Sequence, residues 1–150
     1  MPDILQLRGP RAVSEFRLAK LVAQLSKVDP GIRAVAAEFR HFIELERELA
    51  APERTILERL LAYGEPPAKS HGRLYLVVPR LGTLSPWSSK ATDIAHNCGL
   101  AAVKRIERGT AYYVESAKAG VAAPGKGEIA VGWLCVSTFI TVWVSPPCRA

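Results

Sequence analysis

The sequence has few cysteines, and their spacing indicates neither a disulfide framework nor a zinc site. Its three, Cys98, Cys135 and Cys148, are odd in number, far apart and include no Cys-x-x-Cys pair. Reduced thiols of this kind are typical of a cytosolic protein. The first residues, MPDILQLRGP, lack the basic, apolar and small-residue order of a secretory signal. We therefore expect a cytoplasmic protein.

Long runs of one residue class are also missing. No apolar run reaches the roughly 20 residues of a membrane helix, so no membrane role is expected. The 20 basic and 14 acidic residues give a net charge of +6, but no five basic residues are consecutive. Bases and acids alternate instead, as at Glu44 to Arg47 and Lys104 to Arg108. This mixture favours a solvated surface over a nucleic-acid interface.

What is present suits one globular domain, since 49% of the 150 residues are hydrophobic and 23% are charged. The three histidines, His41, His71 and His96, show no ligand spacing and no accompanying carboxylate pattern, so no metal site is predicted.

The first third of the chain predicts strand, helix and strand. Ile4 to Leu7 alternate weakly as a strand, which Gly9 and Pro10 are expected to end. A helix follows Ser14, its N-cap, and stops at Asp29 to Gly31. The expected apolar stripe of this helix is Phe16, Leu18, Leu21, Val22 and Leu25.

From Ile32 to Leu45 the pattern favours a strand, with Val35, Ala37, Phe39 and His41 on one side, although Ala and Glu content would also suit a helix. A helix beginning near Pro52 and ending at Gly64 comes next. Its expected buried face is Ile56, Leu57, Leu60 and Leu61.

The second half predicts a strand at Arg73 to Pro79, a helix at Ser88 to Cys98 and a strand at Val103 to Ser116. Gly109 predicts a bulge or hairpin turn within the last strand. This order of elements implies a two-layer α+β or α/β domain.

The densest stretch chemically is SPWSSKATDIAHNCGL, Ser85 to Leu100. Pro86 is expected to fix a turn, and Ser88 or Ser89 to cap the helix that follows. Asp93 would suit the positive end of the helix dipole, and Gly99 would end the helix.

This stretch, extended to PRLGTLSPWSSKATDIAHNCGL from Pro79, resembles the first domain of phosphoribosylformylglycinamidine synthase, the large single-chain form. Looser similarities are found in GPRAVSEFRLAKL, AEFRHF, ERLLAYG and IERGTAYYVES, so the resemblance covers about 1–117. It implies an α+β fold, two layers with helices packed on antiparallel sheet. It also implies that the domain resembles two fused copies of the small separate subunit of split synthases.

The resemblance implies a parent enzyme that amidates formylglycinamide ribonucleotide with ATP, magnesium and glutamine in purine biosynthesis. The synthetase and glutaminase machinery is not visible in this sequence, so we expect no cofactor and no catalytic residue here. The chain would then be a structural and coupling module that packs on those two domains. The residues expected at the interface or near the substrate are Ser85, Trp87, Ser88, Ser89, Lys90, Thr92, Asp93, His96 and Asn97.

An alternative is an independent nucleotide or anion binder that uses the helix start from Ser88 to Lys90. A phosphate loop needs a second glycine before the lysine, which this loop lacks. A thiol–imidazole pair of Cys98 and His96 is disfavoured, because residues two apart on a helix point in nearly opposite directions. A small buried residue is the expected role of Cys98, and a hydrogen-bonded or capping group that of His96.

Beyond the resemblance, residues 118–128 form a Gly, Ala and Pro linker, and 129–150 an apolar tail. The core of the tail, WLCVSTFITVWV, predicts an extra strand that pairs within the domain or promotes self-association. An altered reading frame, a mispredicted boundary or a truncation would each produce such a tail. A fragment that does not fold stably is a third reading of the chain.

Overall fold

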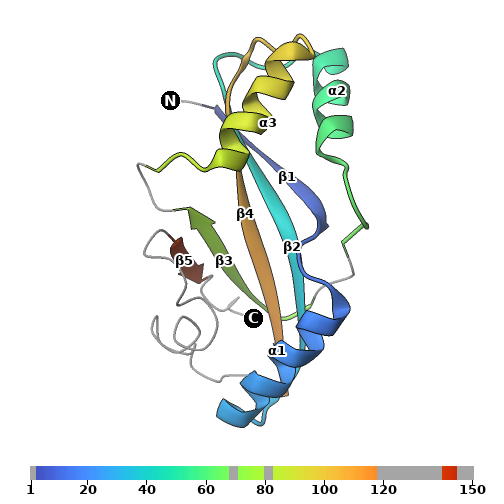
Figure 1. Ribbon diagram of the computed structural model, residues 1–150, viewed down its shortest axis with the longest axis vertical. Helices are drawn as coiled ribbons and strands as arrows, with labels where there is room; N and C mark the ends of the chain where they lie inside the picture. Colours follow the sequence, from blue (N-terminus) through green and yellow to red (C-terminus); the bar gives the residue numbers. More distant parts are fainter. Residues whose placement is uncertain (1–2, 68–70, 80–82, 118–139, 145–150) are drawn as a thin grey trace, which may run out of the picture.

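The structure is a computed structural model that describes residues 3–67, 71–79, 83–117 and 140–144. Its strands form one antiparallel sheet in the order β1-β2-β4-β3-β5, on which three helices pack (Figure 1). This confirms the α+β fold class. The elements are β1 (Asp3–Arg11), α1 (Glu15–Val28), β2 (Ile32–Leu45), α2 (Ala51–Leu61), β3 (Arg73–Pro79), α3 (Pro86–Asn97), β4 (Val103–Ser116) and β5 (Ile140–Val144).

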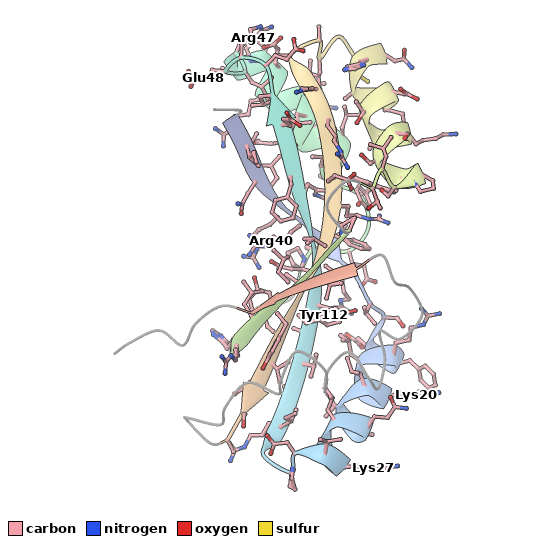
Figure 2. The ribbon with its side chains drawn as sticks, turned by 90° about the vertical axis from the view of Figure 1, so that its left-hand side faces the viewer. Lys20, Lys27, Arg40, Arg47, Glu48 and Tyr112 are labelled. Atoms are coloured by element: carbon pink, nitrogen blue, oxygen red, sulfur yellow. The ribbon has the colours of Figure 1, made fainter. Side chains whose placement is uncertain are left out.

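The two central strands, β2 and β4, are 14 residues long and run the length of the molecule (Figure 1). α2 and α3 lie near one end of these strands and α1 near the other. α1 and α3 lie on the same side of the sheet, whereas Arg40 extends from the opposite side (Figure 2). The fold therefore has a helical layer and a sheet layer.

The main core lies between the sheet and α2 and α3. Ile43 of β2 and Ile106 of β4 are register partners, and both point into this core. Full burial of an aliphatic side chain contributes about 1.5 to 3 kcal/mol to folding. The buried members of the core are Ile43, Leu45, Leu57, Leu61, Ala95, Leu100, Val103 and Ile106.

The same succession of strand, helix and strand occurs twice, as β1-α1-β2 and as β3-α3-β4. In the sheet, β1 and β2 lie on one side of the centre and β4 and β3 on the other, in mirrored order. The arrangement is compatible with two fused copies, which stays a prediction because no sequence repeat supports it.

β1 does not end at Gly9 and Pro10, as the sequence predicted, but continues to Arg11. Arg8 pairs with Arg40 and Arg11 pairs with Glu38, so the register shifts between them. Gly9 and Pro10 therefore lie in a bulge. Gly9 allows the His41 ring to approach the backbone, and an edge strand tolerates the missing amide hydrogen of Pro10.

The bulge or hairpin turn predicted at Gly109 is likewise wrong, because β4 pairs regularly with β2 through Gly109 and Arg40. A Cβ on Gly109 would lie 2.9 Å from Cγ1 of Val78 and 3.2 Å from Cε2 of Phe42. Neighbouring side chains lie so close to the backbone at this position that only glycine fits. In the sequence, such a glycine cannot be told from one that marks a turn.

The predicted buried faces of two helices are too broad. In α1 only Leu21 is buried and Phe16 is 80% exposed, and in α2 Leu57 and Leu61 are buried but Ile56 is 40% exposed. α1 packs mainly on the single strand β2, so a narrow stripe is enough to cover the contact.

β5 lies in the segment predicted to be an apolar tail, and it pairs antiparallel with β3 from Tyr75–Val144 to Pro79–Ile140. The predicted linker, 118–128, and the rest of the tail lie outside the described residues.

We expect Gly9→Ala to destabilise the fold by about 1 to 3 kcal/mol, the usual cost of overpacking. The new Cβ would lie 2.4 Å from Cε1 of His41 and 3.0 Å from Cβ of Phe39. Urea denaturation measures the change, and Gly31→Ala, whose Cβ meets only the movable side-chain ends of Asp29 and Ser116, is the control. When Gly9→Ala is combined with His41→Ala, the loss in the free energy of unfolding should be smaller than the sum of the two single losses. Strict additivity would contradict this packing account.

Candidate functional site

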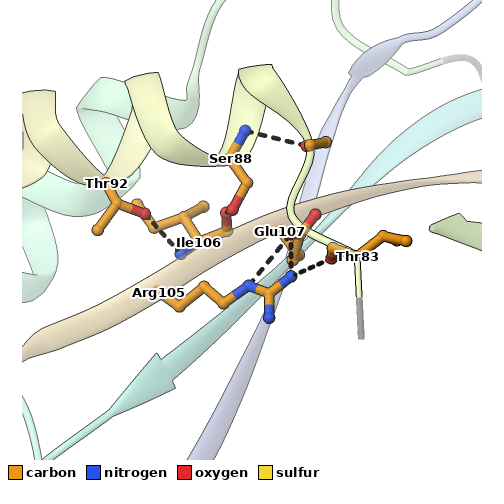
Figure 3. A network of polar contacts seen from close by, with 7 residues as sticks. Thr83, Ser88, Thr92, Arg105, Ile106 and Glu107 are labelled. Carbon is orange, nitrogen blue, oxygen red and sulfur yellow. Dashed lines mark hydrogen bonds and ion pairs between the residues drawn. The ribbon is translucent and has the colours of Figure 1, made fainter. Parts of the chain in front are cut away.

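The start of α3 is attached to an edge of β4 that none of the described strands covers. β3 pairs with β4 only as far as the Val77–Thr110 pair, so the peptide groups of Ile106 lie beyond its end. The buried Ser88 hydroxyl donates to the Ile106 carbonyl at 2.6 Å, and Oγ1 of Thr92 accepts from the Ile106 amide at 3.1 Å (Figure 3). Ser88 and Thr92 are one helical turn apart, so both reach the same residue.

The N-cap of α3 is Ser85, not Ser88 or Ser89 as predicted. Its hydroxyl accepts a hydrogen bond from the Ser88 amide at 3.0 Å, and Pro86 occupies the first helical position (Figure 3). A serine directly before a proline that begins a helix is a sequence signal that could have identified this cap. Pro86 therefore begins the helix instead of fixing a separate turn.

The loop before α3 is attached to β4 by Arg105, which the sequence analysis missed. Arg105 donates to the Thr83 carbonyl at 2.8 Å and forms an ion pair with Glu107 (Figure 3).

Trp87 faces inward and takes part in a stack that joins distant parts of the chain. The guanidinium carbon of Arg108 lies 4.1 Å from the centre of the Phe39 ring and 4.5 Å from that of the Trp87 ring. Arg108 also donates to the Tyr63 hydroxyl at 3.2 Å. The Arg108 stack, as we call Phe39, Tyr63, Trp87 and Arg108, was not predicted, because its members come from four separate segments.

His41 is fully buried beside the Arg108 stack. Its ring stacks on Trp87 with centres 5.7 Å apart, and Nε2 lies 3.0 Å from the Tyr63 hydroxyl. Nδ1 has no hydrogen-bond partner among the residues that the structure describes. Burial, with a smaller effect of the Arg108 charge, lowers the pKa of His41 to about 4. His41 is therefore neutral at physiological pH.

The opposite side of α3 is exposed. The side chains of Lys90, Asp93 and Asn97 point away from the sheet layer. Within the described part of the chain, these side chains make no hydrogen bond or ion pair. Asp93 lies in the middle of the helix, and the first turn of α3 contains no acidic residue, so the predicted dipole role is wrong. Ser89 is half-buried, and its amide donates to the Ser85 carbonyl at 3.2 Å.

α3 ends at Asn97, and Gly99 follows with a φ of 83°, which confirms the predicted stop. Nε2 of His96 lies 2.6 Å from the Val103 carbonyl, which agrees with a hydrogen-bonded role. Cys98 is the C-cap and is exposed, so the expectation of a buried thiol was wrong.

A cavity of about 590 Å³ opens between the start of α3, the end of β3 and the middle of β4. Its lining is mostly apolar, with one cation, Arg108, among the described lining residues. These residues are Val77, Val78, Pro79, Thr83, Leu84, Ser85, Pro86, Arg108 and Thr110.

A family model described as formylglycinamide ribonucleotide amidotransferase N-terminal matches residues 38–128, more than half of the chain. The chain belongs to this N-terminal domain family. This match confirms the resemblance found in the sequence, which is to the first domain of phosphoribosylformylglycinamidine synthase. The match includes the Arg108 stack and all of α3, and it extends into 118–128, which the sequence analysis set apart as a linker. The family supports a place in purine biosynthesis.

The described residues of this N-terminal domain contain no helix that is long and apolar enough to cross a membrane. They also contain no group of three or more His, Cys, Asp or Glu side chains that could hold a metal ion.

We expect Ser85→Ala to destabilise the domain by about 0.5 to 2 kcal/mol, because the Ser88 amide loses its cap. Ser89→Ala, on the same helix, keeps the backbone bond of Ser89 and should change stability by no more than about 0.5 kcal/mol. Chemical denaturation of both variants compares the two positions, and the reverse order of effects would assign the cap to Ser89.

Stability should fall as the pH decreases from about 6.5 towards 4. Since the folded-state pKa of His41 is about 4 and the unfolded one about 6.5, the unfolded chain binds a proton that the native one does not. The loss is at most about 3 kcal/mol, and less if water reaches the imidazole. Denaturation curves between pH 4 and 7 measure it.

His41→Gln should flatten this pH dependence, whereas His71→Gln, which replaces an exposed histidine, should keep it. An unchanged slope in His41→Gln would show that other groups cause the loss.

Proposed function

We propose that this chain acts as the N-terminal structural and coupling domain of a phosphoribosylformylglycinamidine synthase. In the proposed parent enzyme, a ligase of the cytoplasm, formylglycinamide ribonucleotide is amidated with ATP, magnesium and glutamine. The family match supports the assignment, and the two-sided chemistry of α3 supports the coupling role.

The coupling role is supported mainly by one observation: some of the predicted site residues lie on the side of α3 that faces the sheet, and others lie on its exposed side. Ser88 and Thr92 bind the edge of β4, and Trp87 packs on Arg108, so these residues position the helix. The side chains of Lys90, Asp93 and Asn97 make no hydrogen bond or ion pair within the described part of the chain. Polar groups of both charge signs on one rigid helix provide a specific docking face for a partner domain.

In this proposal the chemistry belongs to the partner domains. The His96 imidazole is engaged by the Val103 carbonyl, and Cys98 lies two residues further along, at the helix end. The synthetase domain would supply the sites for ATP, magnesium and substrate, and the glutaminase domain the ammonia. The present chain would position the synthetase domain near the substrate or the ammonia passage.

The alternative anion site at Ser88 to Lys90 is less well supported. The Ser88 amide is bound by Ser85 Oγ and the Ser89 amide by the Ser85 carbonyl. These two amides are therefore not available to an anion, and Lys90 alone would offer a single exposed charge.

Self-association through the apolar tail stays a prediction. β3 already occupies one edge of β5, so only the other edge of that short strand would be available to a second copy.

Reconstitution tests the coupling role. The chain is mixed with a synthase that lacks its first domain, and glutamine-dependent amidation is measured. We expect activity to return, and Asp93→Ala combined with Lys90→Ala to reduce the gain at least about tenfold, since about 1.4 kcal/mol of lost docking energy corresponds to a factor of ten.

The matched control is Glu58→Ala combined with Arg59→Ala, which removes one acid and one base from the exposed side of α2. It should leave the gain unchanged. If the α3 and α2 variants lower activity equally while both stay folded by circular dichroism, α3 is not the docking face.

A further inference from the structure

Arg108 differs from Arg40 and Arg105 in having no carboxylate partner among the residues that the structure describes. Arg40 contacts Glu38 at 3.0 Å, and Arg105 forms an ion pair with Glu107. Arg108 is also partly buried, yet within the described residues no carboxylate lies within 4 Å of it. A guanidinium that is removed from water without a counterion is costly unless another group compensates it.

The Arg108 stack compensates only part of that cost. Phe39 and Trp87 stabilise the cation through their ring faces. Ring faces do not satisfy the N–H groups, which lie in the plane of the guanidinium. One of these groups binds the neutral Tyr63 hydroxyl, and the others have no partner among the described residues, so they remain for a ligand.

The cavity beside Arg108 has the size and chemistry of a small-molecule site. Its volume of about 590 Å³ lies within the range of about 300 to 1,000 Å³ that ligand pockets show. Val77, Val78 and Pro79 form one apolar side, and Leu84 and Pro86 belong to the loop and helix start on the other. Thr110, on the same face of β4 as Arg108, adds a hydroxyl.

Arg108 is the one cation among the described lining residues of the cavity, which favours a carboxylate over a phosphate. A phosphate dianion is usually held by several cations or free backbone amides, whereas the nearby amides of Ser88 and Ser89 are already bound. One guanidinium matches the two oxygens of one carboxylate.

We propose that this cavity binds a carboxylate carried by a short apolar group, with Arg108 as its cationic partner. The carboxylate belongs either to a small metabolite or to an acidic side chain of the adjoining synthetase domain. Only the second source rests on the proposed function.

The test is titration of the full 150-residue chain with butyrate, followed by NMR at the Nε–H of Arg108 and the indole N–H of Trp87. We expect saturable shifts with a dissociation constant in the millimolar range, and at least about tenfold weaker binding of butyramide, which has the same shape without the charge. Equal binding of butyramide, or tighter binding of inorganic phosphate, would overturn the assignment.

Two sets of variants make the result specific. Arg108→Gln should abolish binding, whereas Lys20→Gln, which removes an exposed cation of α1, should leave it unchanged. Because Arg108→Gln also disturbs the stack, Thr110→Glu provides a second test that adds a carboxylate to the cavity. Thr110→Glu should raise stability and block butyrate, and the neutral Thr110→Gln should do neither. Butyrate binding that persists in Thr110→Glu would contradict the proposal.

The same titration of the full-length synthase distinguishes the two sources. If a neighbouring acidic side chain fills the cavity, butyrate will shift neither signal there, and if a metabolite is the ligand, the shifts will persist. A failed reconstitution leaves the titration of the isolated chain unaffected, so the two proposals can fail separately.

Discussion

The uncovered edge of β4 at Ile106 determines where α3 lies. Leaving a buried amide or carbonyl unpaired costs about 1 to 3 kcal/mol, and β3 ends too early to pair with this residue. Two hydroxyls of α3 take the place of the missing strand. Once they are bound, the rotation of the helix about its axis is set, so Trp87 must face the sheet and Lys90, Asp93 and Asn97 must face outward. The interior packing and the proposed docking face therefore have one cause.

The Arg108 stack and His41 form one electrostatic unit. A permanently charged guanidinium lies close to an imidazole that is buried, and both contact Tyr63 and Trp87. The imidazole stays neutral mainly because it is buried, and the charge of Arg108 beside it adds a smaller repulsion. Among the described residues, one cation therefore remains at this point, with its charge available to the cavity. Elsewhere the sheet encloses charge differently, since buried Glu38 is balanced by Arg8 and Arg40.

Much of the fold could be predicted from the sequence, because its signals are local. Alternation identified β2 over Ile32–Leu45, and flanking prolines and glycines bounded β3 and α3 to within a few residues. The misses have physical reasons. Gly9 and Gly109 look like strand breaks, yet they allow close packing against His41, Val78 and Phe42, and Pro10 is tolerated because β1 is an edge strand. The residues Phe39, Tyr63 and Arg108 could not be joined to Trp87, because sheet register brings them together over long separations in the chain. The family was identified from the motif itself and did not require the fold.

The mirrored order of the sheet has a consequence for how the chain folds as it is synthesised. Strand β2 completes its pairing with β1 early, but its other edge pairs with β4, from Leu45–Val103 to Ile32–Ser116. The first half therefore leaves the ribosome with the inner edge of a 14-residue strand unpaired until the last residues of β4 emerge. This pairing joins residues that are far apart in the chain, such as Ile32 and Ser116, so it is a slow step of high contact order. A nascent first half is thus the species most exposed to wrong strand pairing, and its protection depends on the time between the synthesis of β2 and that of β4.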